Sequence, residues 1–68
     1  MDRQILSSDM DSVCEQLSGQ DGGKWTWDVK YPPYRHFLLK DGIVVMAATY
    51  MRELYERASA FMKRRNAA

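Results

Sequence analysis

Cys14 and His36 are the residues of this sequence with the most reactive side chains, and each is the single residue of its kind. A thiol paired with an imidazole becomes a catalytic nucleophile when the fold brings the two side chains within hydrogen-bonding distance. Cys14, however, stands among apolar residues at helical spacing, where free cysteine usually packs as a small core residue. His36 falls in a predicted strand, and we expect it at the surface of the sheet. We therefore predict no catalytic residue and a non-enzymatic protein.

Three carboxylates, Asp9, Asp11 and Glu15, lie within two turns of a predicted helix, a pattern that metal binding or acid–base chemistry can use. Acidic residues in the first turn of a helix also interact favourably with the helix dipole and the cap, and we favour this structural role. One histidine and one cysteine do not make a structural zinc site. The glycines lack the spacing and the lysine of a phosphate-binding loop. The sequence thus predicts no metal and no cofactor.

Aromatic residues dominate the segment from Trp25 to Phe37. Trp25 and Trp27 alternate with polar residues on a predicted strand, and we expect them to supply apolar area to a small core. Tyrosine and tryptophan are also enriched where proteins bind their partners, and the aromatic and basic residues beyond this strand remain for such a contact. The predicted protein-binding residues are Tyr31, Tyr34, Arg35, His36, Arg52 and Arg57.

The basic residues support an alternative, a nucleic-acid-binding site. Residues 1–23 carry one basic and five acidic side chains, a net charge of −4, whereas residues 24–68 carry nine basic and four acidic ones, a net charge of +5. In this alternative Lys24, Lys30, Lys63, Arg64 and Arg65 contact phosphates and an aromatic residue stacks on a base. A basic last turn also suits the helix dipole. Because the total charge is only +1, we predict a protein partner first and keep nucleic acid as the alternative.

The first helix is predicted over residues 9–18, after an N-terminal arm of residues 1–7. Apolar residues recur there at helical spacing, and Ser8 with Asp11 has the spacing of a capping box. Gly19 can end the helix in the left-handed conformation.

A three-stranded antiparallel meander is predicted over residues 24–48. Alternation of aromatic and polar residues marks its first strand, and Asp41-Gly42 between two apolar runs is a strong hairpin signal. Apolar residues at spacings of three and four then predict a helix over residues 50–65, before a tail of residues 66–68. Residues 44–48 also contain good helix formers, so an earlier start of the last helix is the alternative to the third strand. The expected fold class is a small α+β domain, α-β-β-β-α, in which the sheet packs on one or two helices.

This order of elements resembles the plan of double-stranded-RNA-binding domains and of small HicA-type toxins, which implies a similar architecture. The functional motifs of both differ from this sequence. The lysine cluster that such RNA-binding domains carry at the start of the last helix is replaced by Thr49-Tyr50-Met51-Arg52-Glu53, and His36 lacks the glycine-containing context of the toxin histidine. The resemblance therefore concerns architecture and carries little functional information.

The chain has the length of one domain, 68 residues, and a chain this short buries only about 60% of its unfolded surface. With one cysteine no intrachain disulfide is available, so self-association is the remaining source of stability. We expect a homodimer if the apolar residues of the last helix exceed what the sheet can cover; these are Met51, Leu54, Tyr55, Phe61 and Met62.

No apolar run approaches the roughly 20 residues that a membrane span requires, and the N-terminus is too polar for a signal peptide. A lone free thiol fits a cytoplasmic protein. We expect a small regulator or inhibitor that acts by protein–protein contact, of a kind common among phage and mobile-element products.

Overall fold

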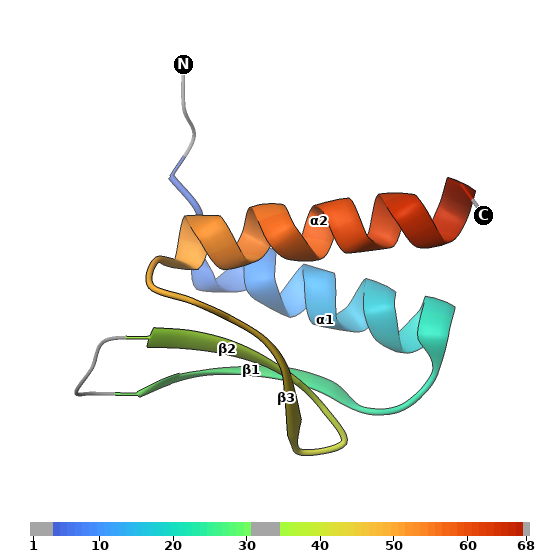
Figure 1. The fold of residues 1–68 in the computed structure, drawn as a ribbon, viewed down its shortest axis with the longest axis horizontal. Coiled ribbons are helices and arrows are strands. Elements are labelled where there is room, and N and C mark those ends of the chain that lie inside the picture. The colour runs from blue at the N-terminus through green and yellow to red at the C-terminus, as the bar shows by residue number, and fades with distance from the viewer. Residues whose placement is uncertain (1–3, 31–34, 68) are drawn as a thin grey trace.

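The fold is a three-stranded antiparallel sheet with two helices on one of its faces (Figure 1). A computed structural model describes residues 4–30 and 35–67. The elements are α1 (Ser7–Asp21), β1 (Trp25–Lys30), β2 (Arg35–Lys40), β3 (Ile43–Ala48) and α2 (Met51–Ala67). The predicted α+β class and element order are confirmed. The sheet order β1-β2-β3 makes β2 the central strand and leaves β1 and β3 as edges. Among the described residues, no element covers the second face, here called the open face.

Helix α1 is longer at both ends than the sequence predicted. It begins where the Leu6 amide donates to Asp9 Oδ2 at 2.8 Å, so the acidic residue of the first turn closes the cap in place of the predicted Ser8–Asp11 pair. It continues through Gly19 to Asp21, and Gly22, with a φ of 74°, ends it. A glycine inside a helix costs only about 1 kcal/mol relative to alanine. Contacts that Asp21 makes with the rest of the fold hold the last turn.

The hairpin between β2 and β3 forms where the sequence placed it. Asp41 and Gly42 have φ values of 52° and 82°, the positive pair that a two-residue type I′ turn needs. The Asp41 side chain also joins the turn to β1, because its Oδ1 accepts from the Lys24 amide at 2.9 Å. Strand β3 spans Ile43–Ala48 and ends where the predicted meander ends, and the alternative of a helix over residues 44–48 is wrong.

Helix α2 begins at Met51, where the Leu54 amide donates to the Tyr50 carbonyl at 3.1 Å. Leu54, Ala58 and Met62 are buried, as the predicted apolar stripe requires, but Tyr50 precedes the helix and is exposed. Neither described helix combines the length and the apolar character needed to cross a bilayer.

The core lies between the helices and one face of the sheet. It contains Met10, Val13, Cys14 and Leu17 from α1, Trp25 and Leu38 from the sheet, Ala48 from the end of β3, and Leu54, Ala58 and Met62 from α2. Trp27 packs against this cluster. The two tryptophans therefore serve the core, as expected.

His36 also lies on the helix-covered face, with 2% of its surface exposed, and the prediction that it lies at the sheet surface is wrong. Its position follows from the strand register. His36 is opposite Val29 on one side and Ala48 on the other, so it shares their face. Its Nδ1 lies 3.2 Å from the Thr49 carbonyl oxygen, so the buried imidazole has a hydrogen-bonding partner.

A β-bulge in β3 changes which side chains face the core. Leu38 is opposite Met46 and Leu39 is opposite Val44, so Val45 is the extra residue. Without it, the alternation that places Val44 beside Leu39 would also place Met46 on the open face. The insertion shifts Met46 and Ala48 to the helix-covered face and leaves Val44 and Val45 exposed.

Candidate functional site

The open face carries an apolar groove. Phe37 and Leu39 from β2 and Val44 from β3 line it, and Asp28 and Lys30 form its border on β1. The groove has a volume of about 240 Å³. Phe37 is opposite Asp28, and Leu39 is opposite Val44, so the strand register brings these side chains together from three strands. Because no described element covers the groove, its side chains remain available to a partner.

Two cations stand side by side at one end of this face. Lys30 and Arg35 are directly opposite each other in the β1–β2 register, and both are exposed. Like charges at opposed positions of a sheet destabilise it. Within the described part of the chain, neither forms a salt bridge with a carboxylate. An acidic group bound here would relieve the repulsion between them.

The third charge of this face, Asp28, has a local role as well. Its Oδ1 accepts from the Val29 amide at 2.8 Å. The groove therefore combines an aliphatic and aromatic floor with one carboxylate at its border and a pair of cations at its end.

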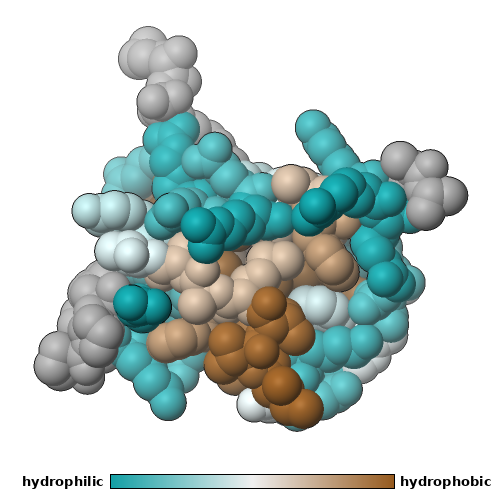
Figure 2. Space-filling view, viewed as in Figure 1, coloured by the Kyte–Doolittle hydropathy of each residue, from teal (hydrophilic) through white to brown (hydrophobic). Residues whose placement is uncertain are grey.

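Apolar surface continues from the groove onto the edge strand β3. Ile43, Val44 and Val45 are 69%, 51% and 46% exposed. Figure 2 shows the most hydrophobic side chains gathered in one patch below α2, where Figure 1 places β3. No charged residue occurs from Gly42 to Met51. Contiguous apolar surface of this kind marks sites where proteins bind partners.

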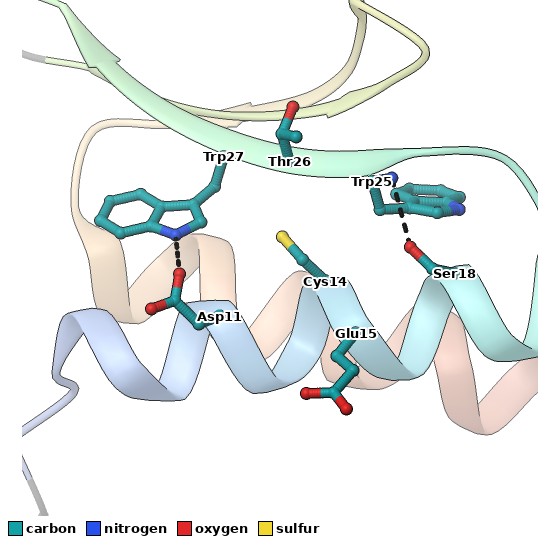
Figure 3. Close-up of a pocket in the computed structure, with 7 residues that line it drawn as sticks. All are labelled: Asp11, Cys14, Glu15, Ser18, Trp25, Thr26 and Trp27. Atoms are coloured by element: carbon teal, nitrogen blue, oxygen red, sulfur yellow. Dashed lines mark hydrogen bonds between the residues drawn. The ribbon is translucent and has the colours of Figure 1, made fainter.

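At the opposite edge of the sheet, β1 packs against α1. A hollow of about 390 Å³ separates α1 from β1, and Figure 3 shows its lining. The Asp11 carboxylate points to the Trp27 indole and accepts from its Nε1 at 2.8 Å, while Ser18 Oγ accepts from the Trp25 amide at 3.3 Å. These polar groups satisfy one another, so the hollow joins helix to strand.

Cys14 lies in this hollow, with its thiol directed at the strand between the two tryptophans (Figure 3). Burial and then the nearby Asp11 carboxylate raise the pKa of the Cys14 thiol. This opposes formation of the thiolate, the reactive form of cysteine. Within the described residues, no group of three histidine, cysteine or acidic side chains is placed to hold a metal ion.

The residues predicted to bind a protein occupy separate places. Arg35 is on the open face and His36 is in the core, whereas Tyr31 and Tyr34 lie outside the described residues. Arg57 donates from Nη1 to the Ala47 carbonyl at 2.7 Å and pairs with Glu53. Arg52 pairs with Glu56, one turn further along α2. Of the described members of the set, only Arg35 belongs to the groove face.

The basic residues of the nucleic-acid alternative do not share one face either. Lys30 ends β1 at the side of the molecule away from the C-terminal end of α2, where Lys63, Arg64 and Arg65 lie (Figure 1). Lys24 is beside the hairpin turn. Arg65 is paired with Asp21.

Asp21 connects three elements of the fold. Its carboxylate pairs with Lys40 Nζ at 3.2 Å and also with Arg65, and so joins the end of α1 to β2 and to the last turns of α2. The hydrogen bond from Lys40, together with the charges of Arg65 and Lys40, holds the pKa of the Asp21 carboxyl below its ordinary value of 3.8. Two cations near the α2 end of the molecule are thus already neutralised inside the fold.

Sequence reasoning missed the groove residues Phe37, Leu39 and Val44 and the exposed Val45. It named surplus apolar surface on the last helix as the condition for a homodimer, but Leu54 and Met62 are buried, and Met51, Tyr55 and Phe61 pack against the core. A signal was nevertheless present, because Phe37 and Leu39 alternate with His36 and Leu38, so both faces of β2 carry large side chains. The two helices lie on one side of the sheet and cover only one of these faces.

Comparisons with protein-family models, curated proteins and solved structures found no match for this chain.

Proposed function

We propose that this protein is a small non-enzymatic binding protein that regulates or inhibits a target protein by direct contact. The target contributes an apolar segment that covers Phe37, Leu39 and Val44, and an acidic side chain that pairs with Lys30 and Arg35. The observation that carries the proposal is an apolar groove that no described element covers, ending in two opposed cations that form no salt bridge within the described residues. A cytoplasmic location belongs to the same proposal, since Cys14 is a free thiol.

The composition of the groove favours a protein over a nucleic acid. Phe37 is the one lining side chain on which a base could stack, since Leu39 and Val44 are aliphatic, and the Asp28 carboxylate at the border repels phosphate. A phosphate backbone also needs a continuous row of cations. The open face supplies two, and the basic residues of α2 lie at the other end of the molecule. Apolar surface beside a compact charge pair instead suits a protein segment with mixed apolar and acidic side chains.

Selection of random peptides displayed on phage against the immobilised protein tests this proposal. We expect enriched peptides to combine apolar residues with aspartate or glutamate. A labelled synthetic copy of the enriched peptide then allows affinity to be measured by fluorescence anisotropy. In the double variant Lys30→Glu/Arg35→Glu its affinity should fall about tenfold, because each exposed ion pair is worth up to about 1 kcal/mol. Lys63→Glu is the matched control, an exposed basic residue on α2, and should leave the affinity unchanged.

Absence of enrichment, or a peptide whose binding is insensitive to the double variant, would refute the proposal. The same assay with labelled single-stranded and double-stranded DNA and RNA addresses the alternative. Oligonucleotide binding that the double variant abolishes would assign the open face to nucleic acid.

A further inference from the structure

We infer that β3 pairs antiparallel with β3 of a second copy of this chain, which joins two three-stranded sheets into one six-stranded sheet. This inference goes beyond the proposed function, because it uses the outer edge of β3 and leaves the groove on the open face. It depends on a difference between the two sheet edges: β1 is protected against pairing with another strand, and most of β3 is not. An edge strand directs the N–H and C=O groups of alternate residues away from its sheet, where another strand can pair with them.

The β1 edge is protected against such pairing. The outward amide of Trp25 donates to Ser18 Oγ, and the outward amide of Val29 donates to the carboxylate of Asp28. The Trp27 side chain is held by Asp11, so α1 runs beside this edge (Figure 3). Charged residues occur at Asp28 and Lys30 of this strand, and charges on an edge are a common protection against strand addition.

The β3 edge has little of this protection. Arg57 donates to the carbonyl of Ala47, so the backbone carbonyl of Ala47 points away from the sheet. This hydrogen bond occupies the edge at the C-terminal end of β3. From Ile43 to Met46, no described side chain hydrogen-bonds to the backbone. This part is uncharged, and its three β-branched residues are among the most exposed apolar residues of the described chain. The bulge at Val45 increases the local twist of this edge but does not interrupt the strand, which runs over all of Ile43–Ala48.

The charge pattern selects a second copy as the occupant. From residue 42 to residue 62 the chain carries two arginines and two glutamates, so β3 and most of α2 have no net charge. This edge offers no attraction to a strongly acidic or basic partner, and two copies meet there without repulsion. The neutral, β-branched strand that fits against Ile43–Met46 is the same strand of another molecule.

The protected β1 edge decides the symmetry of the assembly. Pairing of β3 with β1 of another copy would be a head-to-tail contact, which repeats into a ring or a filament. Because two outward amides of β1 are already bound and the strand carries charges, the isologous contact between two β3 strands is favoured, and a two-fold contact of this kind ends at a dimer.

Sedimentation velocity from micromolar to millimolar concentration tests this inference. The wild-type protein should pass from monomer to dimer over this range. Val45→Glu should weaken dimerisation at least about tenfold, because it places like charges on both sides of the contact. Leu6→Glu is the matched control, since Leu6 is 52% exposed against 46% for Val45 but lies before α1. It should dimerise like the wild type, and circular dichroism should show both variants folded.

Amide hydrogen exchange of the wild-type protein gives a second readout that needs no variant. Amides within residues 43–46 should become more protected as concentration rises, whereas those of β1 should not change. A strict monomer at millimolar concentration, a dimer indifferent to Val45→Glu, or unchanged exchange of residues 43–46 would each overturn the inference. Peptide binding to the groove separates this failure from failure of the proposed function, because Val45 does not line the groove.

Discussion

Replacement of Leu38 by alanine measures how much of the stability depends on the helix-covered face. Leu38 has no exposed surface and lies on the central strand, opposite Trp27 on one side and Met46 on the other. Leucine-to-alanine changes at such sites cost about 2–5 kcal/mol. At roughly 0.05–0.15 kcal/mol per residue, the whole chain has about 3–10 kcal/mol of stability. A loss of about 3 kcal/mol should lower Tm by roughly 12–24 °C, as followed by circular dichroism.

Leu39→Ala is the control for this experiment. It makes the same chemical change one residue later, on the open face, where the side chain is half-buried. Partial burial limits the expected loss to about 1 kcal/mol. Affinity for a groove-binding peptide should fall in Leu39→Ala, because Leu39 lines the groove. Equal destabilisation by the two substitutions would contradict the division into a covered and an open face, as would a Leu38→Ala variant whose Tm falls by only a few degrees.

Two further measurements test the interior contacts. Asp21→Asn should destabilise the protein at neutral pH, since Asp21 pairs with Lys40 and Arg65. The folded state lowers the pKa of Asp21, so the ionised carboxylate stabilises the fold above pH 3.8, and this stabilisation is lost as the pH falls below that value. Unfolding free energies of the wild type and of Asp21→Asn, measured by urea titration, should therefore converge in acid. A difference between them that does not change with pH would refute the pairing. Iodoacetamide should alkylate Cys14 slowly in the native protein and much faster in urea, because burial raises the pKa of its thiol. Equal rates in the two conditions would show that the thiol is not buried.

Local signals accounted for most of the fold. The Asp41-Gly42 turn fixed the hairpin, since its two positive φ values suit few other residue pairs. Helix α1 was harder to delimit, because the glycine at position 19 resembles a stop signal. The contacts that extend the helix involve Lys40 and Arg65, which are distant in sequence. Local propensity cannot register such contacts, and helix ends are therefore the part of a fold that sequence determines least.

The candidate site was less accessible to sequence reasoning than the fold. A pattern of aromatic and basic residues does not state which side chains share a face, and this led to a set that joined buried His36 to residues on α2. The face of His36 depends on pairing with Val29, a register that a single sequence does not specify. Arg35 was predicted for its place beside the aromatic residues and Lys30 for its charge in the nucleic-acid alternative; the register that sets them opposite each other on the open face came only with the structure.

The bulge at Val45 explains why the core and the surface of β3 could not be derived together. A strictly alternating strand from Ile43 to Ala48 places Val44, Met46 and Ala48 on the same face, so it cannot bury Met46 and still present Val44 to the open face. One inserted residue resolves this conflict, so that Ala48 closes the core, Val44 completes the groove and Val45 remains on the edge. The irregularity costs the sheet part of its pairing, and bulges are over-represented at sheet edges and next to active sites. The position at which alternation fails is therefore the position where the two surfaces proposed for binding meet.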